Sequence, residues 1–257
     1  MTSRFSPSRL TSRLFGQRSA SADSADPAVV FIHIPKAGGQ SFRTLIEANY
    51  PKAAWMPIYR TGGTTMDEVF AKVPPERLRR KRIVYGHIPH TVERYLPRPC
   101  RYFTILREPV SRSISVYKYI KHDFDQHARH ESFASGKRSF AQFCRNPRAH
   151  ANIMTKLIAG HEQRSTADAA MLEQAIENLR KMAVVGLFED YEASVNRICE
   201  TFGWSNRYET RNRSSKTNDA FLAAEGARKK DLTALRDANE YDVRLYEEGR
   251  RLYTAGA

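Results

Sequence analysis

Lys36, two adjacent glycines and Ser41 stand between an apolar run and an expected helix, in the stretch VVFIHIPKAGGQSFRT at residues 29–44. Gly38 and Gly39 allow backbone N–H groups to converge on an anion, and the helix that follows adds the positive end of its dipole. Lys36 can neutralise charge on a bridging oxygen during group transfer, and the Ser41 hydroxyl can donate a hydrogen bond. The stretch therefore predicts an anion-binding loop.

The order of its residues separates this loop from the usual triphosphate-binding loop. There, a lysine follows the last glycine and precedes the Ser or Thr that ligates magnesium. Here Lys36 precedes both glycines. Taken alone, the stretch also fits an ordinary strand-to-helix turn with a surface lysine, so other segments must decide between the two readings.

A second anion site is indicated after the apolar run at residues 102–106. Arg107 follows the end of this expected strand, and Pro109 suits the first turn of a helix that we expect to reach about residue 121. Ser115 falls in the second turn of that helix. An arginine from a strand end and a hydroxyl from the following helix can hold one phosphate together.

His87 is the candidate general base. It follows a third apolar run at residues 83–85, and an imidazole can take a proton from an acceptor hydroxyl near neutral pH. The alternative for a single histidine is a hydrogen-bonded structural residue. We assign that structural role to His33, which lies inside the first apolar run.

These residues need a scaffold that brings strand ends together. Four short apolar runs, at residues 29–34, 83–85, 102–106 and 183–187, are typical of buried parallel strands, and helical patterns separate them. The alternation predicts an α/β fold whose ligands bind beyond the carboxyl ends of the strands. Helices are expected at residues 109–121, 140–144, 151–158, 167–182, 191–202 and 228–253, with long loops at 118–139 and 204–218.

Length and composition predict a single domain over residues 28–257, preceded by a disordered Ser- and Arg-rich segment at 1–27. No apolar run is long enough to span a bilayer. The three separated cysteines suit a reducing compartment and the first residues lack the apolar core of a secretory signal, so we expect a cytoplasmic protein with peripheral membrane contact at most. The net charge of +14 favours an anionic partner. The basic block at residues 77–82 is either a solvated strand entrance or an acceptor-binding rim.

Together the motifs resemble the sulfotransferases that use 3'-phosphoadenosine 5'-phosphosulfate (PAPS), in particular the carbohydrate O-sulfotransferase branch, sulfotransferase family 2, with heparan sulfate 2-O-sulfotransferases. Residues 34–42 look like that family's 5'-phosphosulfate loop, residues 107–117 are similar to its 3'-phosphate motif, and residues 85–87 resemble its Gly-His segment. The motifs occur in the family's order, and the likeness covers most of the chain from residue 28 onward.

Three features are variants of the family pattern, and the first is Ala-Gly-Gly-Gln at residues 37–40, one of several forms of the phosphosulfate loop. Glu108 replaces the commoner Asp, and Tyr85 stands where the heparan branch has a second histidine, which bears on the acceptor more than on the reaction. A late basic stretch at residues 211–216 is similar to a family loop that closes over the nucleotide.

The resemblance implies a P-loop-like three-layer fold with a central parallel sheet flanked by helices. It also implies sulfuryl transfer to a carbohydrate or glycolipid hydroxyl, anionic in some cases, with Lys36 and His87 as catalytic residues and no metal. The donor-binding residues implied are Pro35, Lys36, Ala37, Gly38, Gly39, Gln40, Ser41, Phe42, Arg107, Ser115, Arg213 and Ser214.

Two other functions compete with this one. A kinase with an aberrant phosphate loop would use ATP on a small molecule or sugar, and would depend on magnesium. A nucleic-acid-binding module would interleave aromatic and basic residues on one face, for which only residues 117–121 give a hint that helix packing explains as readily. We therefore expect no nucleic-acid partner.

Overall fold

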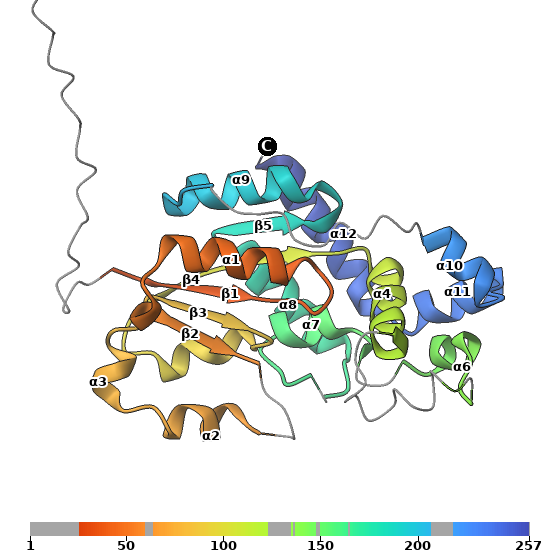
Figure 1. The fold of residues 1–257 in the computed structure, drawn as a ribbon, viewed down its shortest axis with the longest axis horizontal. Coiled ribbons are helices and arrows are strands. Elements are labelled where there is room, and N and C mark those ends of the chain that lie inside the picture. The colour runs from red at the N-terminus through yellow and green to blue at the C-terminus, as the bar shows by residue number, and fades with distance from the viewer. Residues whose placement is uncertain are drawn as a thin grey trace, which may run out of the picture.

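The computed structural model describes residues 26–256, apart from 60–63, 123–134, 136, 148–149, 164 and 207–217. At its centre is a sheet of five parallel strands in the order β2-β3-β1-β4-β5 (Figure 1). The strands are β1 (Ala28–Ile32), β2 (Trp55–Ile58), β3 (Ile83–Gly86), β4 (Cys100–Leu106) and β5 (Val184–Leu187). Because every pairing is parallel, all five carboxyl ends meet at one edge of the sheet.

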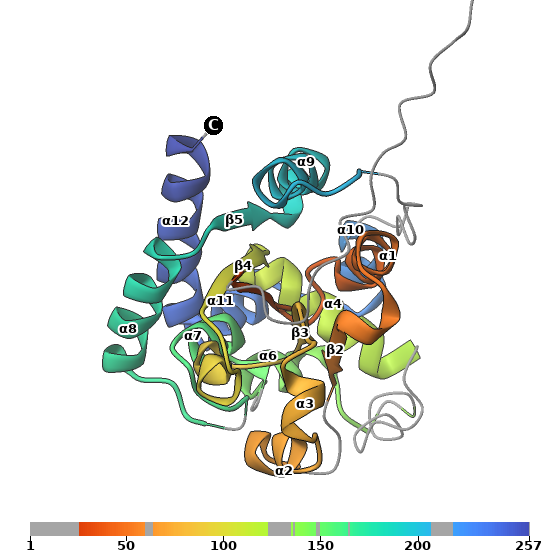
Figure 2. The same cartoon turned by 90° about the vertical axis from the view of Figure 1, so that its left-hand side faces the viewer.

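Helices cover both faces of this sheet (Figure 2). One face packs on α1 (Gly39–Asn49) and α9 (Tyr191–Phe202) through a cluster that includes stacked rings of Phe31 and Phe103, 4.7 Å apart. The other face packs on α7 (Ile153–Ile158), α8 (Ala169–Arg180) and α12 (Glu240–Ala255). The three-layer fold with a central parallel sheet is thereby confirmed.

A further group of helices lies beyond the carboxyl ends of the strands, at the right of Figure 1. It consists of α4 (Pro109–His122), α6 (Phe140–Arg145), α10 (Asn218–Ala224) and α11 (Lys229–Asp237). Tyr117, Phe140, Phe143 and Leu235 form part of a separate buried cluster that holds these helices together. Short α2 (Met66–Ala71) and α3 (Pro75–Leu78) and the 3-10 helices η1 (Lys52–Ala54), η2 (His90–Tyr95) and η4 (Phe188–Asp190) complete the elements.

The four predicted strands are present, and five of the predicted helices end within two residues of their expected bounds. The edge strand β2 was not predicted. Its run is interrupted by Pro57, which lacks a backbone N–H and is therefore tolerated mainly at sheet edges.

The single helix predicted at residues 228–253 was wrong, because the chain forms two helices, α11 and α12. The break lies at Asn239, whose backbone is not helical (φ −116°, ψ 28°). Its buried side chain donates to the Leu235 carbonyl oxygen (2.8 Å) and accepts from the Asn152 N–H (3.1 Å). An asparagine that competes for backbone hydrogen bonds in this way ends a helix.

Other expectations fall partly outside the described residues. Of the predicted disordered segment 1–27, residues 1–25 lie outside them, as do most of the predicted loops at 118–139 and 204–218. Residues 118–122 belong to α4. The basic block at 77–82 precedes β3, so it lies at the opposite end of the sheet from His87 and forms a strand entrance rather than a rim of that site. Within the described residues, no helix is long and apolar enough to cross a bilayer.

A buried charged cluster joins α4 to α7 and α12. Arg112, Lys156 and Asp242 are each at most 2% exposed, and Asp242 accepts hydrogen bonds from the Met154 and Thr155 N–H groups and the Thr155 hydroxyl. Burial lowers the pKa of Lys156 to about 8 and raises the pKa of Asp242. At Lys156 the cost of desolvating the ammonium therefore outweighs its attraction to Asp242.

Replacement of Lys156 by Met should stabilise the protein at pH 7. The folded pKa of about 8 lies below the ordinary lysine value of about 10.4, so the unfolded chain binds more protons between these values and the natural protein gains stability as pH rises through that window. Below pH 8 the free-energy cost of burying the charged Lys156 ammonium is fully present. We expect Lys156→Met to raise Tm at pH 7 by at least about 2 °C, with a smaller gain near pH 9.5. A lower Tm at pH 7, by calorimetry, would contradict this.

Candidate active site

The predicted anion loop connects β1 to α1 by a strained turn. Lys36 has a left-handed backbone (φ 68°), and Gly38, the N-cap of α1, has φ 86°. A non-glycine residue in this region costs about 1–2 kcal/mol, so the surrounding structure must hold Lys36 in place. The turn leaves the first N–H groups of α1 at the carboxyl edge of the sheet.

Both glycines of the loop are required by close packing. A Cβ on Gly38 would lie 2.5 Å from Cε2 of Tyr191, whose hydroxyl donates to the Gly38 carbonyl oxygen (3.0 Å). A Cβ on Gly39 would lie 1.8 Å from Nε2 of His33. Packing against Tyr191 and His33 thus explains the Gly-Gly pair, in addition to any contact of the backbone with an anion.

Arg107 joins the two predicted anion sites. Its Nη1 donates to the Lys36 carbonyl oxygen (2.7 Å), its Nη2 donates to the Ser111 hydroxyl oxygen (3.2 Å), and its guanidinium stacks on Phe188 at 4.2 Å. Burial lowers its pKa. Its Nε is buried and has no hydrogen-bond partner among the described residues. A buried guanidinium with an unsatisfied donor is suited to receive an oxyanion.

Glu108 caps the helix that follows. Its two carboxylate oxygens accept from the N–H groups of Val110 (3.0 Å) and Ser111 (2.6 Å) at the start of α4. These are N–H groups that the helix itself cannot satisfy, and a carboxylate there also favours the helix dipole. The glutamate therefore fulfils a helix-capping role that a shorter aspartate can also perform.

The side chain of Lys36 extends from the loop to α4. Its Nζ lies 4.1 Å from the centroid of the Tyr119 ring, a cation–π contact. Ser115 is half-buried one turn earlier on the same helix. The loop after β1 and the helix after β4 thus touch at two points, through Arg107 and through Tyr119.

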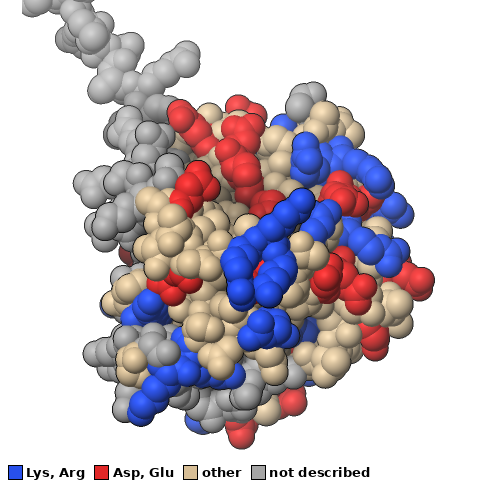
Figure 3. Space-filling view, turned by 90° about the vertical axis from the view of Figure 1, so that its right-hand side faces the viewer, with Lys and Arg blue, Asp and Glu red and all other residues tan. Residues whose placement is uncertain are grey.

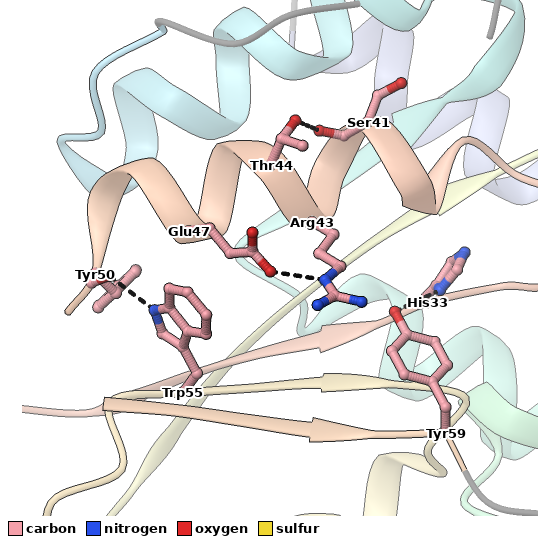
Figure 4. Close-up of polar contacts among 8 residues, drawn as sticks. All are labelled: His33, Ser41, Arg43, Thr44, Glu47, Tyr50, Trp55 and Tyr59. Carbon is pink, nitrogen blue, oxygen red and sulfur yellow. Dashed lines mark hydrogen bonds and ion pairs between the residues drawn. The ribbon is translucent and has the colours of Figure 1, made fainter. Parts of the chain in front are cut away.

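The candidate base lies on the other side of the loop. His87 follows β3 and is half-buried, and its backbone N–H donates to the Ile58 carbonyl oxygen (3.1 Å). Its ring centroid lies 4.9 Å from that of His33 and 5.0 Å from that of Tyr59. Nδ1 of His33 is hydrogen-bonded to the Tyr59 hydroxyl at 3.1 Å (Figure 4).

His33 is held neutral. Burial lowers its pKa well below the ordinary value, and the nearby charges of His87 and Lys36 lower it further. His33 therefore lies within electrostatic reach of both predicted catalytic residues. Its contact with His87 was not predicted, because the histidine reads as an interior position of an apolar run, and only the parallel pairing of β1 with β3 brings the two residues together.

The structure thus gathers Lys36, the loop backbone, His87 and Arg107 at the carboxyl edge of the sheet, with Ser115 on the adjoining helix. Ser41 is buried on the side of α1 away from His33 (Figure 4). Arg213 and Ser214 lie outside the described residues. Figure 3 shows the face beyond the strand ends, where basic side chains spread across the middle of the described surface.

Two further observations bear on ligands. Among the described residues, no group of three or more His, Cys, Asp or Glu side chains is placed to hold a metal ion. A separate hollow lies at the amino ends of β4 and β5 and is lined in part by His90, Tyr102, Asn178 and Lys181. None of the predicted site residues that the structure describes lines that hollow.

A comparison with models of protein families agrees with the sequence motifs. The family model described as "Sulfotransferase family" matches residues 23–247. Among solved structures, the crystal structure of a sulfotransferase from Alicyclobacillus acidocaldarius aligns with 84% of this chain and 97% of its own, at 13% identity and a TM-score of 0.37. Comparison with curated proteins gave no significant match.

The Gly39 contact gives a stability test of the loop geometry. Gly39→Ala should lower Tm by about 3 °C or more, because the new methyl group overlaps the His33 ring and overpacking of this kind costs about 1–3 kcal/mol. Thermal unfolding of the single and double variants measures the coupling. In a His33→Ala background the same glycine change should cost much less.

Gly256→Ala is the matched control, because a Cβ there meets atoms no closer than 3.5 Å and should leave Tm nearly unchanged. Equal costs of Gly39→Ala with and without His33 would show that the two residues are not packed as described.

Proposed function

Because the chain belongs to the sulfotransferase family, we propose that it transfers a sulfuryl group from PAPS to a hydroxyl of a carbohydrate or glycolipid acceptor. The family assignment itself establishes a transferase that moves sulfuryl groups. The donor, the O-sulfation and the acceptor class are our inference from the site.

One observation carries the donor assignment, namely the environment of Arg107. This guanidinium is held between the loop carbonyl of Lys36 and the α4 hydroxyl of Ser111, and its buried Nε has no hydrogen-bond partner in the part of the chain that the structure describes. The 3'-phosphate of PAPS would accept a hydrogen bond from this Nε and neutralise the buried charge of the guanidinium. The N–H groups of residues 38–42 at the start of α1 are suited to the 5'-phosphosulfate. Two anion sites at one edge of the sheet suit a nucleotide with two phosphorylated positions better than a single phosphate.

The proposed reaction is an in-line displacement at sulfur. An acceptor oxygen forms a new bond to sulfur, the bond between sulfur and the 5'-phosphate oxygen breaks, and adenosine 3',5'-bisphosphate leaves. His87 takes the acceptor proton, and Lys36 stabilises the negative charge on the leaving phosphate oxygen. His33, which lies beside His87, is neutral. His87 can therefore take the proton, because a positive charge on His33 would oppose the formation of a second positive charge on His87.

The surroundings of His87 support a sugar acceptor. Tyr59 is the one exposed large apolar side chain among the described residues, at 40% exposure, and its ring stands nearly perpendicular to that of His87. Arg43 and Glu47 form an ion pair at 2.6 Å on the adjacent turns of α1 (Figure 4). An aromatic ring for the apolar face of a pyranose and charged groups for its hydroxyls are features of carbohydrate sites.

Nucleotide binding tests the donor assignment. In EDTA, adenosine 3',5'-bisphosphate should bind the purified protein more tightly than ATP, and Arg107→Ala should weaken that binding by at least about tenfold, since a charge-assisted hydrogen bond contributes about 1.5–3 kcal/mol. Titration calorimetry measures both effects. A preference for magnesium-ATP would contradict the proposal and favour the kinase alternative.

Turnover tests the catalytic assignments. Lys36→Ala and His87→Ala should each reduce transfer of labelled sulfate from PAPS by roughly two orders of magnitude or more, the scale typical of positioned electrostatic and acid-base groups. Lys181→Ala, an exposed lysine on the C-terminal side of α8, is the control and should retain full activity. Near-normal turnover in both site variants would defeat these roles.

A further inference from the structure

Lys118 lies on the same face of α4 as the predicted phosphate-binding serine. Ser111, Ser115 and Lys118 are spaced by four and three residues, so they line one face of the helix, with Arg107 at its N-terminal end. Lys118 is half-buried, and its Nζ lies 4.6 Å from the centroid of the Phe221 ring on α10. The sequence motifs do not assign Lys118 a role.

Asn218 connects this lysine to Arg107. Nζ of Lys118 donates to Oδ1 of Asn218 (3.0 Å), and Nδ2 of Asn218 donates to the Ser111 hydroxyl oxygen (3.3 Å). Nη2 of Arg107 donates to that same oxygen (3.2 Å). Because the Ser111 oxygen accepts two hydrogen bonds, its own proton is left to donate outward. A lysine, a serine hydroxyl and an arginine thus form one connected group of donors.

The charges of this group are of one sign. Arg107 acts on Lys118 strongly enough to help lower its pKa, second only to partial burial, so the two cations are close neighbours. The carboxylates that act on Arg107 are Glu189 and Glu108, and both are engaged: Glu108 caps α4, and Glu189 accepts from the Glu108 N–H and the Tyr246 hydroxyl. Two cations held together in this way are stabilised by an anion between them.

Lys121, one turn further along α4, shows the contrast. Its Nζ forms an ion pair with Glu225 at 2.5 Å, in a partly buried position beside Tyr117. Its charge is therefore matched within the protein. Lys118 instead donates to a neutral amide oxygen, and Asn218 directs it towards the Ser111 and Arg107 side of the helix.

We propose that Lys118, oriented by Asn218, is a second cation for the 3'-phosphate of the donor and sets the preference for 3'-phosphorylated nucleotides. This inference rests on the proposed function. Lys118 and Arg107 would bind phosphate oxygens from two sides, and the Ser111 hydroxyl would donate to a third. Asn218 also begins the helix that follows the late basic stretch, so nucleotide binding would be coupled to the position of α10.

The test compares two nucleotides that differ only in the 3'-phosphate. By calorimetry, Lys118→Met should weaken binding of adenosine 3',5'-bisphosphate by about tenfold or more, and binding of adenosine 5'-phosphate by less than about twofold. Methionine retains a long apolar stem on Phe221, and thermal unfolding verifies the fold. Lys118→Gln serves the same comparison if methionine perturbs the packing. Lys118→Arg should restore most of the preference, and Asn218→Ala should lose part of it.

Lys181→Met is the matched control, because it removes the same charge from a distant exposed site and should leave both affinities unchanged. Equal weakening for both nucleotides, or no weakening in a folded Lys118 variant, would overturn this inference while the donor assignment stands. If the unaltered protein bound neither nucleotide, the proposed function itself would fail, and this inference with it.

Discussion

The arrangement of the site depends on one hydrogen bond, from Arg107 to the carbonyl oxygen of Lys36. It links the loop after β1 to the segment after β4, which are neighbours in the sheet but about 70 residues apart in sequence. Lys36 has a left-handed backbone that is unfavourable by itself, and the bond to a buried guanidinium is one of the contacts that hold it. Loss of the Arg107 side chain would therefore disturb both anion sites.

The position of Arg107 in turn depends on how α4 is held. Glu108 caps its first turn, Arg112 enters the buried cluster with Asp242, and Tyr117 packs among Phe140 and Phe143 beyond the strand ends. The helix is thus fixed at its start, at its middle and towards its end. A rigid helix keeps donor-binding side chains in register with the loop, which is the form of preorganisation that charge stabilisation requires.

Much of this could be predicted from sequence, and the exceptions have physical causes. Apolar runs reveal buried parallel strands, and the residues that follow them must share an edge, so Lys36, His87 and Arg107 could be grouped. Asn239 breaks a helix through a contact with Asn152, 87 residues away, which no local pattern contains. The proximity of His33 to His87 follows from strand register, and the link between Lys118 and Asn218 from the docking of α10. Such contacts come from tertiary packing and not from local propensity.

We propose that one nucleotide bisphosphate spans the loop of residues 34–42 and the group around Arg107. A crystal structure of the complex with adenosine 3',5'-bisphosphate tests it most directly. We expect the 5'-phosphate at the N–H groups of residues 38–42 and the 3'-phosphate within hydrogen-bond distance of Arg107. A nucleotide bound in the opposite orientation, or in the hollow beside His90 and Asn178 at the amino ends of the strands, would contradict it.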